Sequence, residues 1–566
     1  MAISGIEAFL EVLHQFGVRR IFGNPGTTEL PLNDRLVVDR RFHYVLGLHE
    51  TPVMAMADGF AMASRTLAVV NLHISCGLGN AMGMLYNAHR EGTPLLVTAG
   101  QQDRRLAWEE PILGGDMVSV AKPWTKWSYE VTRAVDMPIA VKRAAQLALT
   151  PPTGPVFLSL PVDVQRELTE AADLSPISLP DSRVSPSQNA IENAGKILCA
   201  AQHPAILAGS RVMEREAIAA LVKLAERLGA PVIAESGTTH GRLPFPCDHP
   251  LYAPGLPLWS PEIRERLQEF DVLLVVGMDL LRQYVYHEPS RPLPEHLKLV
   301  HLDENAWQLN KNYAIDAPVL GDIGMSLEAI SDYLGSKMTW EQRAASQSRA
   351  TEVSNAHQSQ RANLRAKIAA DSNARPMTSW AAMGAVADAL PPGAAVIEEA
   401  VTTTNTVLER LGVISPPDGY FGHRGWALGW GLGVAIGAKM AWPDRPVLAL
   451  LGDGAAGYGI QGLWTAAREK TPVVFVVFHN AQYQILKIGA TGMGLPQAMQ
   501  GKFEGLDLVG PAVDYVRLAE GFGVQGVRIG STEELSTAIS SGLRSDQPLL
   551  IEAPISRDVA KRLEYG

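Results

Sequence analysis

VLALLGDG, residues 447–454, and PVVFVVFHN, residues 472–480, are the stretches that decide the fold. Each is an apolar run that ends in polar residues, Asp453 in the first and Asn480 in the second. Short uninterrupted apolar runs are typical of strands that are buried on both faces of a parallel sheet. Ligands of open parallel sheets bind where such strands end, so we expect Asp453 and Asn480 at one ligand site.

The chemistry of these two side chains suits a metal-bound diphosphate. A carboxylate and an amide oxygen are hard ligands that Mg²⁺ accepts together with phosphate oxygens. Gly452 and Gly454 flank Asp453, which lets the backbone approach a diphosphate at the start of the following helix. GDG by itself is also a common tight turn. The two apolar runs and the 27 positions between Asp453 and Asn480 favour the diphosphate site.

This pattern is typical of the thiamine-diphosphate binding motif, and further segments carry the same likeness. They are FGNPGTTELP (22–31), NLHISCGLGNAMGMLYNA (71–88), TPLLVTAGQQ (93–102), KWSYEV (126–131) and GLWTAA (462–467). The chain resembles the thiamine-diphosphate enzymes of the pyruvate decarboxylase and acetolactate synthase type, and within them most the benzoylformate decarboxylases. The likeness covers nearly the whole chain and is strongest over residues 20–165 and 425–490.

The resemblance implies thiamine diphosphate and Mg²⁺ as cofactors, with Ca²⁺ as an alternative metal. FAD is not favoured, but it stays open because some relatives hold a flavin in the central domain. The implied metal ligands are Asp453, Asn480 and Gln482. The implied activity is non-oxidative decarboxylation of a 2-oxo acid to an aldehyde and CO₂. A carboligase, acetolactate synthase-like transferase or aldehyde lyase is the alternative, and a non-catalytic cofactor-binding assembly protein is another. The implied cofactor-binding residues are Asn24, Pro25, Gly26, Asn80, Val401, Thr402, Leu428, Gly452, Asp453, Gly454, Ala455, Asn480, Gln482, Tyr483, Gln484, Ile485 and Leu486.

Glu50 is the candidate for the acid that the family places against the aminopyrimidine ring. It follows the apolar run RFHYVLGLH (41–49) and precedes small and apolar residues that suit a closely packed helix. A carboxyl group buried in such company can exchange a proton with the ring nitrogen. Taken without the motif, Glu50 would be read as a charge that favours a helix N-terminus.

His73 and Thr27 are two further catalytic candidates that rest on the resemblance. His73 follows the predicted strand 67–72 and matches an active-site histidine that relays protons. A structural histidine is the alternative. Thr27 stands where benzoylformate decarboxylases carry a serine that contacts the substrate carboxylate, and it keeps the hydroxyl. Its alternative role is to cap a helix that begins near Glu29.

The sequence departs from the benzoylformate decarboxylase pattern at two places. A second catalytic histidine is expected in LLRQYVYHEP (280–289), where Val285 takes its position and only a shift of two residues brings in His287. After the metal asparagine, Gly489 replaces a large aromatic residue that covers the substrate ring.

His423 and Arg424 precede Leu428, where the related enzymes are small and apolar. An imidazole and a guanidinium near the thiazolium would bind a carboxylate or polar substrate, or replace the missing histidine. A surface loop is the alternative for both residues.

The composition of the chain and the position of its linker segments predict three doubly wound α/β domains. They are an N-terminal pyrimidine-binding domain (1–172), a central domain (189–335) and a C-terminal diphosphate-binding domain (376–566). A Pro/Ser-rich linker occupies 173–188, and 336–375 is predicted as an exposed helical connector. Predicted strands are 67–72, 95–99, 156–160, 205–208, 232–234, 272–276, 299–302, 396–398, 447–451, 473–478 and 549–552.

The formal charge of −10 gives no electrostatic reason to expect a nucleic acid or membrane partner, and no apolar run approaches a membrane span. The three cysteines form no metal spacing and no disulfide framework, which favours a cytoplasmic protein. Two glycine runs, GLGNAMG (77–83) and GLGVAIG (431–437), lack the spacing of a dinucleotide fingerprint and predict close helix packing between the first and third domains. In the resembling family that contact joins subunits, which implies a homodimer or dimer of dimers with the active site between subunits.

Overall fold

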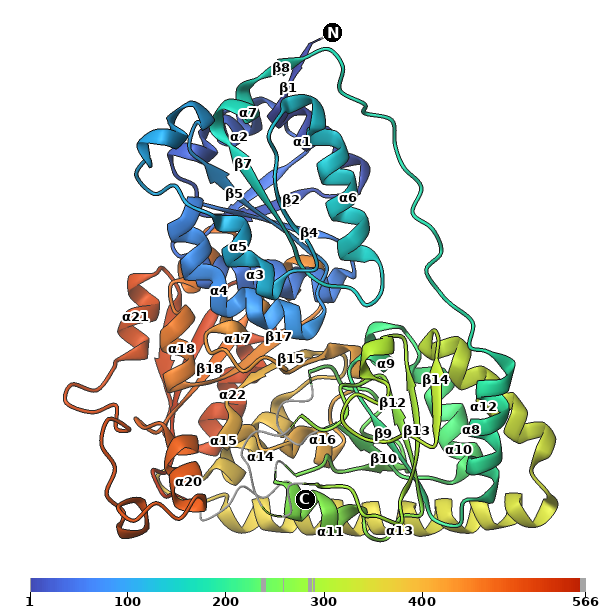
Figure 1. Ribbon diagram of the computed structural model, residues 1–566. Helices are drawn as coiled ribbons and strands as arrows, with labels where there is room; N and C mark the ends of the chain where they lie inside the picture. The colour runs from blue at the N-terminus through green and yellow to red at the C-terminus, as the bar shows by residue number, and fades with distance from the viewer. Residues whose placement is uncertain (1, 236–240, 258, 283–287, 289–290, 560–566) are drawn as a thin grey trace.

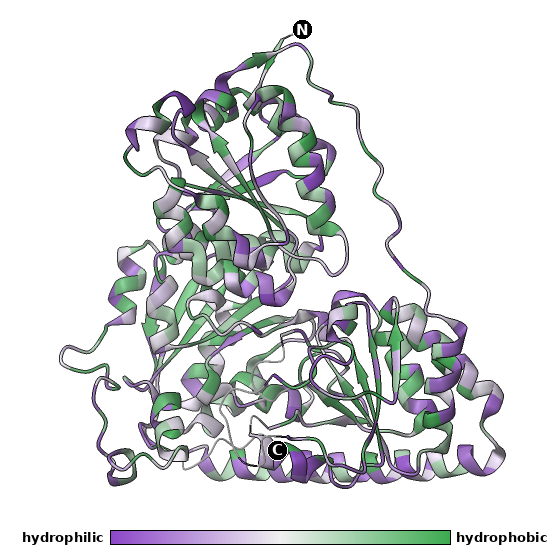
Figure 2. Ribbon diagram, viewed as in Figure 1, coloured by the Kyte–Doolittle hydropathy of each residue, from purple (hydrophilic) through white to green (hydrophobic). Residues whose placement is uncertain are grey.

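Three six-stranded parallel sheets, with helices packed around them, build the chain (Figure 1). The computed structural model describes residues 2–235, 241–257, 259–282, 288 and 291–559. Figure 2 shows the strands in green inside the helical layers, whose outer faces carry most of the purple. Burial of apolar strands between helices is the arrangement expected of parallel sheets. The predicted class, α/β with three doubly wound domains, is confirmed.

The N-terminal sheet has the order β3-β2-β4-β5-β7-β6. Its strands are β2 (Arg20–Gly23), β3 (His43–Leu46), β4 (Ala68–Leu72), β5 (Leu95–Gln101), β6 (Ser128–Glu130) and β7 (Val156–Pro161). Its helices are η1 (Thr27–Glu29), α1 (Gly5–Gln15), α2 (Leu30–Val38), α3 (Glu50–Ser64), α4 (Ile74–Glu91), α5 (Met117–Ala121), α6 (Met137–Leu149) and α7 (Val162–Arg166). A short antiparallel pair, β1 (Ile3–Ser4) with β8 (Leu168–Thr169), closes the domain.

The central sheet has the order β11-β10-β9-β12-β13-β14. Its strands are β9 (Pro204–Ala208), β10 (Val232–Ala234), β11 (Tyr252–Ala253), β12 (Val272–Val276), β13 (Lys298–Asp303) and β14 (Ala317–Leu320). Its helices are α8 (Gln188–Ala200), α9 (Arg211–Glu214), α10 (Ile218–Leu228), α11 (Ser260–Leu267) and α12 (Ile323–Lys337).

The C-terminal sheet has the order β16-β15-β17-β18-β20-β19. Its strands are β15 (Ala395–Glu399), β16 (Tyr420–Phe421), β17 (Val447–Gly452), β18 (Val474–His479), β19 (Gln525–Arg528) and β20 (Leu549–Pro554). Its helices are α14 (Ser379–Ala389), α15 (Val401–Thr404), α16 (Val407–Leu411), α17 (Trp430–Ala441), α18 (Asp453–Gly459), α19 (Gly462–Arg468), α20 (Gln484–Gly492), α21 (Tyr515–Gly521) and α22 (Thr532–Gly542).

The two predicted connectors differ in character. Residues 170–187 run without regular secondary structure, as the long trace between the first two domains in Figure 1 shows. Residues 340–371 form one 32-residue helix, α13 (Trp340–Asp371). Most of α13 is exposed, but Ser346, His357 and Leu364 are buried against the central and C-terminal domains. The helix is therefore a strut between domains.

Helices α3 and α17 form the closest contact between the N-terminal and C-terminal domains. A Cβ at Gly433 would lie 2.6 Å from the Cβ of Ala55, and a Cβ at Gly59 would lie 2.3 Å from the Val434 carbonyl oxygen. The glycines are therefore required for this approach. The predicted close packing of the 431–437 run is confirmed, but the partner is α3 of the same chain and not the helix of the 77–83 run.

The hydrophobic core does not stop at the domain boundaries. One cluster of buried apolar residues unites the central and C-terminal domains, and a second unites the N-terminal and C-terminal domains. Among the described residues, no helix is long and apolar enough to cross a membrane. Cys76, Cys199 and Cys247 are free thiols, as predicted.

Candidate active site

The carboxyl ends of β17 and β18 bring the two deciding motifs together. The strands are parallel neighbours, with Gly452 paired to Phe478. Asp453 is the first residue of α18, and Asn480 directly follows β18. The Asp453 Oδ2 accepts a hydrogen bond of 2.6 Å from the backbone N–H of Ala481. The strand-end placement predicted for Asp453 and Asn480 is thus present in the structure.

Asp453 is a buried carboxyl group at the start of a helix. Burial raises its pKa above the ordinary value, while hydrogen bonds from the backbone amides of Gly454 and Ala481 oppose that rise. Burial of a carboxylate is costly unless it is paired with a cation or bound by donors. A divalent cation at Asp453 would stabilise the charged form, so the electrostatics of this position fit a metal.

The loop after β18 is held by its own polar side chains. The Asn480 Oδ1 accepts the backbone N–H of Gln482 at 3.1 Å, and its Nδ2 donates to Gln484 Oε1 at 3.1 Å. A Cβ at Gly454 would lie 2.7 Å from the Tyr483 ring, so only glycine fits beside that ring. These contacts fix the residues that the sequence assigns to the cofactor at the start of α20.

The side chain of Gln482 is engaged elsewhere. Its Oε1 accepts a hydrogen bond of 2.8 Å from Lys487 Nζ, and its Nε2 donates to the Arg557 carbonyl at 2.8 Å. An ammonium group beside Oε1 competes with any metal ion for that oxygen. Gln482 can therefore serve as the third predicted metal ligand only through its main-chain carbonyl, and its side chain shapes the loop instead.

Glu50 begins α3 at the carboxyl edge of the N-terminal sheet and is buried. Its Oε1 accepts a hydrogen bond of 3.1 Å from Asn24 Nδ2, and its Oε2 accepts one of 3.0 Å from Asn80 Nδ2. A Cβ at Gly77 would lie 3.2 Å from Glu50 Oε1. Three residues that the sequence assigns to one site, Glu50, Asn24 and Asn80, therefore lie in direct contact.

His73 lies at the next strand end, after β4, with its side chain 23% exposed. The Nδ1 of His73 is 2.8 Å from Glu29 Oε2. A Cβ at Gly26 would overlap the His73 ring, at 2.1 Å from Nδ1. The turn that contains Pro25 and Gly26 thus packs directly on the imidazole, and Glu29 orients it.

Thr27 is the exposed first residue of η1. The N-cap positions of η1 and α2 belong to Gly26 and Glu29, and Thr27 makes no side-chain capping bond there. The capping alternative is therefore wrong, and the Thr27 hydroxyl is accessible at the rim of the strand ends.

Leu428, Val401 and Thr402 lie on the C-terminal domain near a carboxylate that sequence reasoning missed. Val401 begins α15, directly after β15. Glu399, the last residue of β15, accepts hydrogen bonds of 2.9 Å from the backbone N–H groups of Gly429, Trp430 and Gly431. Burial raises the pKa of Glu399 to about 7, although these amides oppose the rise. Glu399 thereby fixes the turn that carries Leu428, and its only sequence signal is an acid at the end of an apolar strand.

His423 is buried and not part of a surface loop. Its ring stacks on Trp430 with 5.2 Å between centroids, and its Nδ1 accepts the backbone N–H of Trp426 at 3.1 Å. Burial lowers the pKa of His423 to about 4, so the ring is neutral and its proton sits on Nε2. Within the described part of the chain, Nε2 has no hydrogen-bond partner.

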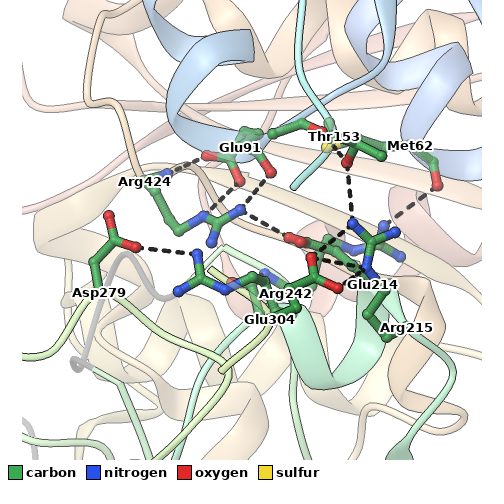
Figure 3. A network of polar contacts seen from close by, with 12 residues as sticks. Met62, Glu91, Thr153, Glu214, Arg215, Arg242, Asp279, Glu304 and Arg424 are labelled. Carbon is green, nitrogen blue, oxygen red and sulfur yellow. Dashed lines mark hydrogen bonds and ion pairs between the residues drawn. The ribbon is translucent and has the colours of Figure 1, made fainter. Parts of the chain in front are cut away.

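Arg424 connects three domains (Figure 3). Its side chain is 4% exposed; its Nε lies 3.2 Å from Glu91 Oε2 of α4, and its Nη2 donates to Glu214 Oε1 of α9 at 2.8 Å. Although burial opposes it, Glu214 and Glu91 raise the pKa of Arg424 further above its ordinary value. The surface-loop alternative and the predicted substrate contact of Arg424 are both wrong, because the buried guanidinium is balanced by carboxylates of the other two domains.

Two remaining sequence predictions have different outcomes. His287 and the aligned Val285 lie outside the described residues, so the second histidine stays a prediction. Gly489 lies in α20, and a Cβ there would meet no atom within 4 Å. The position of the replaced aromatic residue is therefore open space in this chain.

The two halves of the site stand on different domains. Across the described ranges, no hydrogen bond joins Glu50, Asn24 or Asn80 to the edge that holds Asp453 and Asn480. Each half is assembled on its own sheet, at the carboxyl ends of parallel strands, where α/β domains bind ligands.

Comparison with known proteins assigns all three domains. The sequence matches "Thiamine pyrophosphate enzyme, N-terminal TPP binding domain" over residues 3–113, the central domain of the same family over 191–330, and its C-terminal TPP binding domain over 400–553. The chain belongs to the thiamine pyrophosphate enzyme family. The benzoylformate decarboxylase of Pseudomonas aeruginosa is 35% identical over 557 residues, which cover 97% of this chain and 98% of that protein.

Other relatives of this thiamine pyrophosphate enzyme extend to the synthases. A probable acetolactate synthase large subunit of Methanococcus aeolicus is 27% identical over 575 residues, 98% of this chain and 92% of the relative. A solved structure described as a Rhodococcus jostii RHA1 thiamine diphosphate-dependent 4-hydroxybenzoylformate decarboxylase has a TM-score of 0.86 at 31% identity, covering 99% of this chain and 100% of that one. The predicted family is thereby confirmed.

Proposed function

We propose that this protein is a Mg²⁺-dependent, non-oxidative decarboxylase that converts a 2-oxo acid into an aldehyde and CO₂. The observation that carries the proposal is the full-length identity of 35% with a benzoylformate decarboxylase. The structure adds that Glu50 and Asp453 occupy strand ends on the two cofactor-binding domains. Thiamine diphosphate, when bound, supplies the nucleophilic carbon and the electron sink that release of CO₂ requires.

The metal would be held by Asp453, Asn480 and the main-chain carbonyl of Gln482. All three supply hard oxygen ligands, and their number leaves room for phosphate oxygens. Mg²⁺ suits this set, and Ca²⁺ is the alternative. The diphosphate would lie at the first turn of α18, where Gly454 keeps the backbone free of a side chain.

Proton transfer would be shared by Glu50 and His73. Glu50 would hold and return a proton at the aminopyrimidine ring, and hydrogen bonds from Asn24 and Asn80 fix both carboxylate oxygens for this task. His73 is oriented by Glu29 and remains partly accessible, so it can exchange a proton with the substrate carbon.

The substrate would lie between Thr27 and α20. The exposed Thr27 hydroxyl can donate to the substrate carboxylate. Open space at Gly489 leaves room for a substrate wider than a phenyl group or for a second carbonyl compound. The neutral His423 would act through the N–H at Nε2, as a donor and not as a charged acid.

A complete site requires two chains in this proposal, because in the described part of the chain no hydrogen bond joins Glu50, Asn24 or Asn80 to Asp453 or Asn480. The N-terminal half exposes Leu106, Trp108 and Ile112, and the C-terminal half exposes Met493 and Met499. Exposed apolar groups of this size are typical of surfaces that another protein covers. A homodimer or dimer of dimers would cover them and join Glu50 of one chain to Asp453 of the other.

A flavin is not part of the proposal. At the carboxyl edge of the central sheet, buried Arg211 donates to Asp303 Oδ2 at 2.7 Å and to Asp279 Oδ1 at 3.0 Å. The visible spectrum of the purified protein tests this, since a flavin absorbs there.

The decisive experiment is to incubate the holoenzyme with a panel of aromatic and aliphatic 2-oxo acids, with and without an acceptor aldehyde. Release of CO₂ with one equivalent of aldehyde supports the decarboxylase. Hydroxyketone formation as the main product would favour the carboligase or acetolactate synthase-like alternative, to which the Methanococcus aeolicus relative lends support. If the protein binds the cofactor but converts none of these 2-oxo acids, the result would support the alternative of a non-catalytic cofactor-binding assembly protein.

A further inference from the structure

A loop, residues 480–483, follows β18 and carries two of the proposed metal ligands. A neighbouring segment holds its main chain. The N–H of Leu508 donates to the Ala481 carbonyl at 2.8 Å, and the N–H of Tyr483 donates to the Leu506 carbonyl at 2.9 Å. These bonds fix the path of the loop, but the positions of its side chains depend on other contacts, and those contacts involve a lysine.

The lysine is Lys487 of α20, whose side chain is 7% exposed. Its Nζ donates to Gln482 Oε1 at 2.8 Å and to Asp507 Oδ1 at 2.8 Å, and it lies 5.3 Å from the ring centroid of Phe503. A buried ammonium group is costly unless it is paired, and these contacts replace the water that the group has lost. Lys487 is therefore held in one place, with one of its N–H groups donated to Gln482.

The last described residues of the chain complete the arrangement. Gln482 Nε2 donates to the Arg557 carbonyl at 2.8 Å, and Gln484 Nε2 donates to the Asp558 carbonyl at 2.6 Å. The guanidinium group of Arg557 also forms an ion pair of 2.5 Å with Asp507. Both the oxygen and the nitrogen of the Gln482 side-chain amide are thus engaged in hydrogen bonds.

The main-chain carbonyl of Gln482 differs from its side chain. Gln482 is 4% exposed, and among the residues that the structure describes none donates a hydrogen bond to this carbonyl oxygen. A buried carbonyl without a donor is costly, and a cation beside it would compensate. The side-chain oxygen has an ammonium partner instead, which repels a metal ion. Lys487 therefore determines which oxygen of Gln482 is available to a metal.

We propose that Lys487 is a positioning residue for the metal ion and acts on it through Gln482. The inference rests on the proposed function, because it takes the main-chain carbonyl of Gln482 as a metal ligand. Lys487 occupies Oε1 and leaves the carbonyl for the metal, while Asp507, itself paired with Arg557, holds the ammonium group in place. Mg²⁺ demands a near-ideal octahedral geometry, whereas Ca²⁺ accepts a variable one. Loss of the lysine should therefore weaken the binding of Mg²⁺ more than that of Ca²⁺.

The test measures the concentrations of Mg²⁺ and of Ca²⁺ at which half of the full-length protein binds thiamine diphosphate. The protein is first stripped of metal with a chelator, and binding is followed by intrinsic tryptophan fluorescence. In Lys487→Met, the ratio of the Mg²⁺ value to the Ca²⁺ value should rise about tenfold or more, since groups that hold metal ligands typically contribute about tenfold to hundredfold in metal affinity. The lost positive charge affects both divalent ions alike and cancels in the ratio.

Asp507→Asn separates position from charge. It removes a negative charge, whereas Lys487→Met removes a positive one, so the electrostatic effects of the two substitutions have opposite signs. Both variants should nonetheless raise the ratio, Asp507→Asn by less because the bond from Lys487 to Gln482 remains. Lys502→Met is the matched control, because Lys502 is an exposed lysine whose Nζ donates to Gln500 Oε1 at 3.0 Å. It should keep the ratio of the parent.

A folded Lys487→Met variant with the ratio of the parent would overturn this inference and leave the proposed function intact. A lower thermal midpoint with an unchanged ratio would give Lys487 a structural role only, and it would overturn the inference as well. If the parent binds thiamine diphosphate equally well without a divalent ion, both the proposed metal site and this inference are refuted. Should Lys487→Met fail to fold, Asp507→Asn decides alone, since the Asp507 side chain is 39% exposed and its replacement leaves no cavity.

Discussion

Gly437 of α17 lies so close to Met56 of α3 that a Cβ at position 437 would be 1.9 Å from the Met56 carbonyl oxygen. Gly437→Ala should therefore force the two helices apart and destabilise the protein by about 1–3 kcal/mol, the usual cost of overpacking. The thermal midpoint measures this. Gly521→Ala is the control, since Gly521 is also helical and a Cβ there meets nothing within 4 Å. An unchanged thermal midpoint in Gly437→Ala would show that α3 and α17 can move apart without loss of stability.

Asp453→Ala should lose most of its affinity for thiamine diphosphate. The carboxylate is the only charged side chain proposed as a ligand of the metal, and a charge-assisted bond is worth about 1.5–3 kcal/mol, or roughly tenfold to hundredfold in affinity. Calorimetric titration with Mg²⁺ present measures the loss. Asp546→Ala, at an exposed loop position, should bind the cofactor as the parent does. Parent-like affinity in Asp453→Ala would refute the metal assignment.

Glu50→Gln should retain the cofactor but lose the proton exchange that activates it. A glutamine can accept a hydrogen bond from Asn24 or Asn80, but it cannot transfer a proton. The rate of hydrogen–deuterium exchange at the thiazolium C2 of the bound cofactor is the measurement, and it should fall by orders of magnitude. Exchange at the parent rate would assign activation to another group.

Gly489→Phe should improve the handling of benzoylformate relative to an aliphatic 2-oxo acid. The open space at Gly489 accepts a side chain without a clash, and aromatic contact is worth about 0.5–1.5 kcal/mol beyond burial, or roughly threefold to tenfold. The ratio of kcat/KM values for the two substrates is the readout. Gly489→Leu separates stacking from simple filling, because it should leave that ratio closer to the parent's.

Asp58→Asn should change the pH dependence of stability. Asp58 is fully buried and accepts a hydrogen bond of 2.8 Å from Trp430 Nε1, and burial raises its pKa from 3.8 to about 6. The folded state therefore holds a proton that the unfolded state releases, so stability falls as pH rises from about 4 to 6 and is constant above that range.

Asparagine does not titrate. The thermal midpoint of Asp58→Asn should therefore rise relative to that of the parent between pH 4 and 6, and the difference should be the same at pH 8 as at pH 6. Asp546→Asn, an exposed aspartate, should follow the parent at every pH. A constant difference between Asp58→Asn and the parent across this range would contradict the raised pKa.

The strand ends were predictable because their signal is local. Apolar runs locate β17 and β18, and the residue after each run is at the sheet edge by geometry alone. The partners of Arg424 were not predictable, because Glu91 and Glu214 come from two other domains and no local pattern links them. The glycines of α17 predicted that another helix packs closely against it, but a small residue does not specify which helix that is.

Glu399 shows a second limit of the sequence. An acid at the end of a buried strand reads as an anomaly until the amides of Gly429, Trp430 and Gly431 are seen around it. The sequence of side chains does not indicate which backbone N–H groups will act as donors. Residues whose partners are backbone groups, as those of the Glu399 carboxylate are, therefore escape pattern-based reasoning most readily.

The seam between α3 and α17 limits how this chain can be recombined with its relatives. Because Gly59, Gly433 and Gly437 each face a backbone or side-chain atom of the opposite helix, the two helices form a matched pair. A chimera that takes residues up to the linker from one relative and the remainder from another would join unmatched surfaces. A chimera in which α3 and α17 come from the same protein would keep the matched pair, and it would allow the N-terminal domain of this enzyme to be moved into a relative.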